Sequence, residues 1–363
     1  MPIKEQSFRI GCGRYLQGAG TINSIGDEVL RVGHAPLIVG GKTALSITRE
    51  KIEKSVSPVC PSYRFEEHTG TCNDDDAKIL AEIAKNGGFD VIVGVGGGVI
   101  MDFSKLIGHF AELPVINVPT SSATCAAYTP LSVRYTREGH TVGSMHYGRE
   151  VNAVIADTEI MLKQPARLLL AGIFDAVAKF VEIKHRFAGE VTECPLGLDW
   201  AYVLSIHSYK ELFAKAEPCL EDMRNGVLSD TVEQLIFTTV AATGVISGIA
   251  RGSNQTALAH KFYEMTRVLF HAEARPYLHG EIVGIGLLLQ NRFNGEEENS
   301  RELIDMMKKY GMPYKVSDIG VEPTSESLEK YYDKLEGCSA IAEGGPDAKE
   351  KLRDALEYLW SLG

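Results

Sequence analysis

The chain has 363 residues, of which 44% are apolar, and carries a formal net charge of −11 with a sequence pI of about 5.5. This length and apolar content can bury a substantial core, and a chain of this size usually divides into two domains. Because nucleic-acid backbones are bound by clustered Lys and Arg, so acidic a chain with no basic run argues against a nucleic-acid partner.

The N-terminal segment has no uninterrupted apolar run, so we expect no secretory signal. The longest candidate for a membrane span, residues 283–289, contains glycines and ends in a polar tripeptide, so no spanning segment is expected. The cysteines lie at positions 12, 60, 72, 125, 194, 219 and 338 without a CxxC pair, which indicates reduced thiols. The sequence therefore predicts a cytoplasmic protein.

The first part of the chain alternates between predicted strands and predicted helices. Short apolar runs that do not alternate with polar residues predict buried strands at 35–40, 90–95, 113–118 and 151–156. Stretches with helical periodicity lie between them, at 76–85 and 100–110. This order predicts an α/β domain over residues 1–162, built on a Rossmann-like parallel sheet with helices on both faces.

From about residue 163 the pattern becomes helical. We predict helices at 168–185, 198–214, 232–249, 255–269, 281–291 and 348–362. Proline breaks the regular backbone of a helix, and Pro165, Pro195, Pro218 and Pro276 are predicted to lie between these segments. The expected organisation is an all-helical domain over 163–363 after the α/β domain.

A glycine-rich loop follows the second predicted strand. Residues 91–105 read VIVGVGGGVIMDFSK, so Gly96, Gly97 and Gly98 stand between a strand and a helix. Glycine lets the backbone approach a phosphate, and the helix start offers free N–H groups. The G-x-G-x-x-G pattern is incomplete because Val99 replaces its last glycine, and a tight turn without a ligand is the alternative. The segment PTSSAT at 119–124 follows the next strand, and the two loops would share the ligand-binding edge of the sheet.

Three residues of the helical part have the chemistry of metal ligands. Asp175 and His260 lie among small or apolar residues, and His279 stands at the expected start of a helix. Two imidazoles and a carboxylate, with room for a substrate oxygen, are typical of a catalytic zinc or iron(II) site. The alternatives are that Asp175 caps a helix and that the histidines are ordinary core or surface residues.

Several motifs occur in a known order. They are GRYLQGAG at 13–20, GGGVIMDFSK at 96–105, VPTSSAT at 118–124, PLSVRYT at 130–136 and ADTEI at 156–160. In these motifs and their spacing the chain resembles the iron-containing alcohol dehydrogenase superfamily, specifically its glycerol dehydrogenase-like branch, from residue 13 to about 290. The resemblance implies a dehydroquinate synthase-like fold, with a dinucleotide-binding domain followed by a metal- and substrate-binding domain.

The resemblance also implies site residues. Asp175, His260 and His279 would be the metal ligands and the catalytic centre, with one zinc or iron ion. A nicotinamide dinucleotide, NAD or NADP, would be held by Gly41, Gly96, Gly97, Gly98, Asp102, Lys105, Thr120, Ser121, Thr124, Thr129, Leu131, Val133 and Tyr135. The expected partners are a small-molecule substrate and further copies of the chain in a homo-oligomer, with no nucleic acid and no membrane.

Cys125 narrows the class of expected substrates. The segment around it resembles the hydroxycarboxylate dehydrogenases, and where glycerol dehydrogenases typically carry an aspartate this chain has Cys125. A 2-hydroxy acid is therefore favoured, with Cys125 near the substrate or serving only as a small buried filler. The alternatives are glycerol dehydrogenase, a lyase-type relative, and a catalytically inactive nucleotide-binding protein. The first predicted strand ends in Val39-Gly40-Gly41-Lys42 without an acid, which slightly favours NADP and leaves NAD open.

Overall fold

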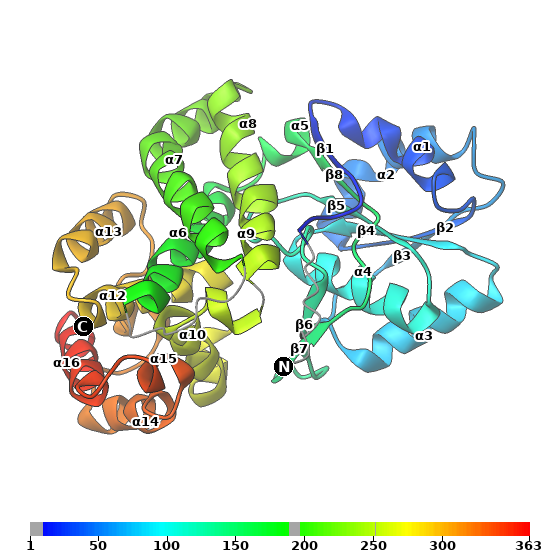
Figure 1. Ribbon diagram of the computed structural model, residues 1–363. Coiled ribbons are helices and arrows are strands. Elements are labelled where there is room, and N and C mark those ends of the chain that lie inside the picture. Colours follow the sequence, from blue (N-terminus) through cyan, green and yellow to red (C-terminus); the bar gives the residue numbers. More distant parts are fainter. Residues whose placement is uncertain (1–9, 189–196, 251) are drawn as a thin grey trace, which may run out of the picture. The chain divides into compact units, whose positions relative to one another are not determined.

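The computed structural model describes residues 10–188, 197–250 and 252–363. The chain forms two compact units (Figure 1). The first unit runs to Leu169 and also contains Ala214–Gly248, and the second contains Leu170–Phe213 and Ile249–Gly363. The predicted fold class is confirmed, with a parallel sheet in the first unit and a largely helical second part.

The first unit is built on a six-stranded sheet with the order β1-β8-β5-β4-β2-β3, in which every neighbouring pair is parallel. The four predicted strands are confirmed as β2 (Pro36–Gly40), β4 (Val91–Gly96), β5 (Val115–Pro119) and β8 (Ala153–Asp157). The two edge strands, β1 (Tyr15–Gly18) and β3 (Arg64–Glu67), were not predicted. Edge strands are only partly buried and here lack a continuous apolar run, so the sequence gives no strand signal for them.

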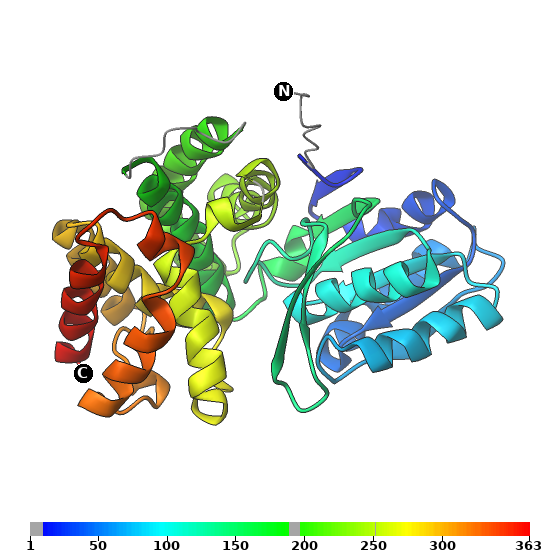
Figure 2. The ribbon, with the colours of Figure 1, turned by 60° about the horizontal axis from the view of Figure 1, so that its bottom comes forward.

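Helices cover both faces of this sheet, as predicted (Figure 2). On one face, α1 (Ile25–Leu30) and α2 (Lys42–Val56) pack on Ile38, Val93 and Val95. On the other, α3 (Asp74–Asn86) and α4 (Gly98–Ala111) pack on Leu37 and Ile92. Alternate residues of one strand thus enter opposite cores, which explains why the central strands are apolar throughout.

An antiparallel hairpin and a short helix complete the region up to residue 169. The hairpin pairs β6 (Leu131–Tyr135) with β7 (Thr141–His146), and α5 (Thr158–Met161) follows β8. The hairpin was not predicted, because most residues of β7 are exposed and the strand lacks an apolar run.

A later segment of the chain returns to the first unit. Helix α8 (Asp230–Phe237) contacts β1, because Gln17 Nε2 donates to the Glu233 carbonyl at 2.8 Å and to its carboxylate at 2.7 Å. Thr158 Oγ1 donates to the same carboxylate at 2.6 Å. The predicted division at residue 162 differs from this one, in which Ala214–Gly248 belongs to the first unit. Hydrogen bonds between positions so distant in the sequence leave no local signal from which the return could be predicted.

The second unit contains helices and no strand among its described residues. Three helices contain a limit between the two units and so belong to both, namely α6 (Ala166–Ala188), α7 (Leu198–Asn225) and α9 (Thr243–Ala250). The others are η3 (Gly252–Gln255), α10 (Leu258–Leu269), α11 (His271–Ala274), α12 (His279–Phe293), α13 (Glu297–Lys309), η4 (Ser317–Ile319), α14 (Ser325–Leu335), α15 (Ser339–Ala342) and α16 (Ala348–Ser361). All six predicted helices of this part are present with shifted ends.

The prediction that Pro218 lies between helices is wrong, because α7 continues through it. A proline inside a helix removes one backbone hydrogen bond at a cost of about 3 kcal/mol. Ala216, Cys219 and Leu220 around it are buried, so packing outweighs that cost. Pro195 lies outside the described residues.

The run Asp230–Ala250 is long and apolar enough to cross a membrane by length and composition alone, contrary to our expectation that no segment would be. It consists of α8, a π-helical turn (Thr238–Ala242) and α9. Of its apolar window, 61% is buried inside the protein. A core helix has the same composition, so the packing of this run accounts for its apolar character.

Two glycines let α12 approach its neighbours closely. A Cβ at Gly280 would lie 1.8 Å from the Ala171 carbonyl oxygen of α6, and one at Gly286 would lie 2.5 Å from the Ala259 carbonyl oxygen of α10. Backbone atoms cannot move aside for a Cβ atom in the way that the end of a flexible side chain can, so only glycine fits at these helix crossings.

We expect Gly286→Ala to lower the free energy of unfolding by about 1–3 kcal/mol, because overpacking at a rigid crossing exceeds the gain in helix propensity. Chemical denaturation followed by circular dichroism measures the change. Gly337→Ala is the matched control, since a Cβ there meets nothing within 4 Å. Equal stability of the two variants would contradict the close approach of α10 and α12.

Candidate active site

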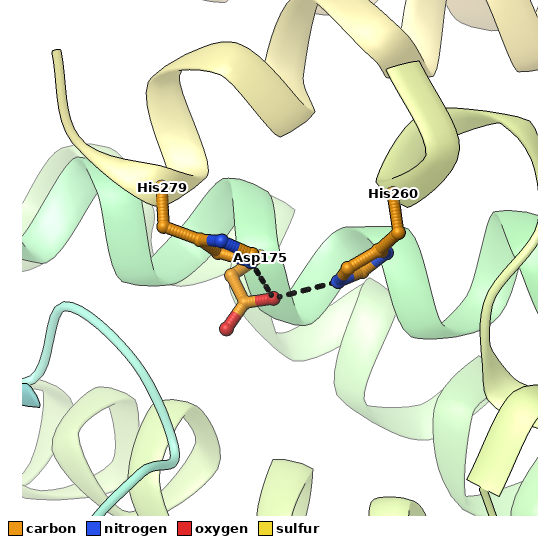
Figure 3. A group of neighbouring side chains, drawn as sticks. All are labelled: Asp175, His260 and His279. Atoms are coloured by element: carbon orange, nitrogen blue, oxygen red, sulfur yellow. Dashed lines mark ion pairs between the residues drawn. The ribbon is translucent and has the colours of Figure 1, made fainter. Parts of the chain in front are cut away.

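Three helices of the second unit carry the predicted metal ligands (Figure 3). Asp175 lies well inside α6, so the alternative that it caps a helix N-terminus is wrong. His260 lies in the first turn of α10, and His279 is the first residue of α12. Positions far apart in the sequence are therefore brought to one place.

The three side chains converge on one carboxylate oxygen. Asp175 Oδ1 lies 3.4 Å from His260 Nε2 and 3.4 Å from His279 Nε2 (Figure 3). One ligand atom from each residue lies within 4.8 Å of the others, and both Asp175 and His260 are buried. His279 remains more accessible, with 28% of its side chain exposed.

This donor set fits a divalent metal. Tetrahedral coordination with ligand distances of about 2.0–2.1 Å separates neighbouring ligand atoms by about 3.3–3.4 Å. The two 3.4 Å separations at Asp175 Oδ1 agree with that spacing. Three protein ligands leave a coordination position for a substrate oxygen, as in catalytic zinc sites.

Glu182 orients His260 and was missed by the sequence analysis. Its Oε2 is hydrogen-bonded to His260 Nδ1, while its Oε1 accepts from the backbone N–H groups of Ala257 at 2.6 Å and His260 at 2.9 Å. With Nδ1 engaged, Nε2 faces Asp175, and such carboxylate partners fix the tautomer of a metal-binding histidine. The sequence contained a signal for Glu182: it is acidic like Asp175 and follows it by seven residues, and residues seven apart lie on one face of a helix.

The charges of the cluster shift its pKa values. Burial lowers the pKa of His260, but the Glu182 carboxylate outweighs burial and raises it to about 9. Burial raises the pKa of Asp175, yet the Lys179 ammonium and the two imidazoles hold it well below the usual value. Burial also lowers the pKa of His279, opposed by Asp175. The carboxylates are thus ionised, the form that binds a metal.

Aromatic packing orients His279, the third predicted ligand. The Tyr263 ring meets the His279 imidazole edge-on with centroids 4.2 Å apart. Tyr263 lies one turn after His260 on α10, so the same helix supplies one ligand and packs against the other.

The predicted cofactor loops lie together in the first unit, at the carboxyl ends of neighbouring strands. Gly41 follows β2, Gly96 ends β4, Gly97 is the N-cap residue of α4, and Gly98 is the first residue of that helix. Thr120 follows β5, and its N–H donates to the Gly96 carbonyl at 2.9 Å, which joins the two loops. A Cβ at Gly97 would meet only Ser121 Oγ, at 3.5 Å, so open space lies beside this backbone.

Asp102 and Lys105 hold the segment that follows the PTSSAT loop. Lys105 is buried, and its Nζ donates to the carbonyls of Ala126 at 2.7 Å and Thr129 at 2.9 Å and to that of Leu131. Asp102 lies 2.9 Å from the Lys105 ammonium and accepts from the Val133 N–H at 3.0 Å. The two residues therefore position the predicted cofactor residues Thr129, Leu131 and Val133, while their own contact with a cofactor stays a prediction.

The remaining predicted residues lie in the same region of the first unit. Ser121 is buried, Thr124 is half-buried, and Thr124 Oγ1 accepts from the Ala126 N–H at 3.3 Å. Tyr135 ends β6 and donates its N–H to the Cys72 carbonyl at 2.8 Å. Cys125 is buried, and its carbonyl accepts from the Tyr128 N–H at 2.9 Å.

Comparison with known proteins identifies the class. Residues 12–158 match the model of the iron-containing alcohol dehydrogenase family. A glycerol dehydrogenase of Thermotoga maritima is 30% identical over 337 residues, which cover 89% of this chain and 87% of that protein. Hydroxycarboxylate dehydrogenase A of Escherichia coli K12 is 28% identical, covering 90% and 89%. The crystal structure of a probable glycerol dehydrogenase from Sinorhizobium meliloti superposes with a TM-score of 0.84 at 23% identity, covering 99% of each chain.

These likenesses, with the fold and the ligand geometry, define an oxidoreductase that acts on small hydroxy compounds. The chain belongs to the iron-containing alcohol dehydrogenase family. Enzymes of this family use a nicotinamide dinucleotide and a divalent metal, and the predicted resemblance is confirmed.

We expect Glu182→Gln to weaken zinc binding by roughly 10- to 100-fold, because the amide oxygen can keep both backbone hydrogen bonds but loses the charge that supports His260. Titration of the metal-free protein in competition with a chromophoric chelator measures the affinity. Glu264→Gln, at a half-exposed position one turn after His260, is the matched control and should bind as the wild type does. Unchanged affinity in Glu182→Gln would show that Glu182 does not support the ligand.

Proposed function

We propose that Asp175, His260 and His279 hold a divalent metal and that the chain uses it to interconvert a small hydroxy compound, with a 2-hydroxy acid favoured, and its oxo form. The observation that carries this proposal is the convergence of two imidazole nitrogens on one buried carboxylate oxygen at 3.4 Å each. The exposed fraction of His279 leaves one side of the cluster open to a ligand.

The residues of the chain prepare the site for hydride transfer. When bound, the metal supplies a Lewis acid that stabilises negative charge on the substrate oxygen, and the dinucleotide accepts or donates the hydride. Glu182 accepts a hydrogen bond from the His260 Nδ1–H group, so that Nε2 is the ring nitrogen whose lone pair would bind the metal. Burial of Asp175 and His260 removes water and strengthens their electrostatic interactions.

The loops at the carboxyl ends of β2, β4 and β5 are proposed to bind the dinucleotide. Gly97 and Gly98 present backbone at the start of α4, where N–H groups and the helix dipole favour a pyrophosphate. The related structure of sulfoacetaldehyde reductase from Bifidobacterium kashiwanohense contains NAD+, and the relative from Pyrobaculum neutrophilum is a glycerol-1-phosphate dehydrogenase of NAD(P)+. Either dinucleotide is compatible with the Gly40-Gly41-Lys42 strand end.

Glycerol dehydrogenase is the second candidate function. Several relatives carry that name, including those of Thermotoga maritima and Citrobacter freundii. The buried thiol of Cys125, where an aspartate was expected for a polyol, favours the hydroxy acid. We place the enzyme in the cytoplasm as a homo-oligomer without nucleic-acid or membrane partners.

With zinc or, under nitrogen, iron(II), we expect the protein to oxidise NADH or NADPH in the presence of short 2-oxo acids, dihydroxyacetone or simple aldehydes. Removal of the metal by a chelator should abolish turnover, and His260→Ala should lower it by at least about 100-fold, since a ligand is lost. His34→Ala, which removes an exposed imidazole, is the control. Turnover that persists in His260→Ala, or none with any pair of cofactor and substrate, would refute the proposal.

Gly97→Ala should weaken dinucleotide binding by about tenfold or more while stability stays within about 0.5 kcal/mol, because the added methyl has room in the protein but occupies the approach to the phosphate. NADH fluorescence titration gives the affinity, and thermal unfolding gives the stability. Gly337→Ala is again the control. Wild-type affinity in Gly97→Ala would remove this loop from the cofactor site.

A further inference from the structure

Lys179 lies beside the metal ligands and takes no part in the function proposed so far. It follows Asp175 by one turn of α6, is only 5% exposed, and places Nζ 3.8 Å from Asp175 Oδ1. That oxygen is the one on which His260 Nε2 and His279 Nε2 converge. A buried ammonium group therefore adjoins the metal centre.

The hydrogen-bonding capacity of this ammonium is unused among the described residues. A lysine ammonium has three N–H donors, and 3.8 Å is too long for a hydrogen bond to Asp175. Lys105 offers a comparison within the chain, because it is equally buried and donates to three backbone carbonyls. Burying a charge without hydrogen-bonding partners is strongly unfavourable. The N–H groups of Lys179 are therefore available to donate hydrogen bonds to a bound ligand.

The charge balance indicates the sign of that ligand. Asp175 and Glu182 contribute one negative charge each, Lys179 contributes one positive charge, and a divalent metal with two neutral imidazoles contributes two more. One net positive charge remains in a buried site. A monoanion neutralises it, whereas a neutral substrate leaves the charge uncompensated and a phosphate dianion reverses it.

The spacing indicates where the anion lies on the substrate. A metal would lie about 2 Å from Asp175 Oδ1, so that metal and Lys179 Nζ are at most about 6 Å apart. A substrate whose metal-bound oxygen and anionic oxygen lie on neighbouring carbon atoms can span this distance. We infer that Lys179 binds the carboxylate of a 2-hydroxy or 2-oxo acid and sets the preference for anionic substrates. This inference rests on the proposed function.

The test compares two substrates that differ in charge but share a carbon skeleton. The rates of reduction of pyruvate and of hydroxyacetone are to be measured for the metal-loaded wild type, Lys179→Met and Lys184→Met. In Lys179→Met we expect kcat/KM for pyruvate to fall by roughly 10- to 100-fold, while that for hydroxyacetone changes by less than about threefold. Lys184→Met, further along α6 at a partly exposed position paired with Glu296, should match the wild type for both.

Two further measurements separate this inference from its rivals. Metal content by mass spectrometry should be the same in Lys179→Met and the wild type. Loss of metal from the variant, or an equal fall of kcat/KM for both substrates, would show that Lys179 supports the metal site. Either result would overturn the inference. Calorimetry with oxamate, an anionic analogue that is not reduced, should show binding to the metal-loaded wild type that weakens by roughly 10-fold or more in Lys179→Met.

Oxamate binding also distinguishes failure of the proposed reaction from failure of the proposed role of Lys179. Binding that depends on Lys179 without any turnover would refute the proposed reaction and keep the anion site. Turnover of hydroxyacetone, together with equal oxamate affinity in the wild type and Lys179→Met, would support the reaction and refute the role of Lys179.

Discussion

The second unit depends on the burial of charge along one helix. α6 carries Asp175, Lys179 and Glu182, all at most 5% exposed, in a helix that is otherwise largely apolar where it is buried. Isolated charges are unfavourable in such surroundings, and the two carboxylates obtain partners from other helices. His260 engages both carboxylates and His279 engages one, which ties α10 and α12 to α6. The same electrostatic requirement that stabilises this packing also assembles the three side chains that we propose as metal ligands.

Close packing makes that electrostatic arrangement possible. α12 approaches α6 and α10 at Gly280 and Gly286, where any side chain would overlap backbone. Gly280 directly follows His279, and Gly286 meets Ala259, which directly precedes His260. The glycine crossings therefore fix the positions of both imidazoles relative to Asp175. Precision of this kind is needed because a Lewis acid acts only where its ligands hold it.

Local patterns allowed much of the molecule to be predicted. The central strands were recognised because both faces of a parallel sheet are buried, which makes the strands apolar throughout. The glycine loop at 96–98 was recognised because a strand-to-helix turn with free N–H groups has a distinctive composition. Asp175 and His260 were selected because polar side chains in apolar helices are rare, and His279 because it is a possible ligand at the expected start of the following helix; their convergence was an expectation. The motifs then identified the family.

The sequence by itself thus determined the α/β-then-helical class and the central strands, and it singled out the glycine loop and the three side chains that are proposed to bind a dinucleotide and a metal. Only the tertiary structure decided which groups surround those ligands and how the chain divides. Edge strands lack an apolar run, and the return of Ala214–Gly248 to the first unit depends on contacts such as that of Gln17 with Glu233. The roles of Glu182 and Lys179 depend on distances between helices. Such relations arise from long-range packing, whereas periodicity and motifs report only the neighbours of a residue along the chain.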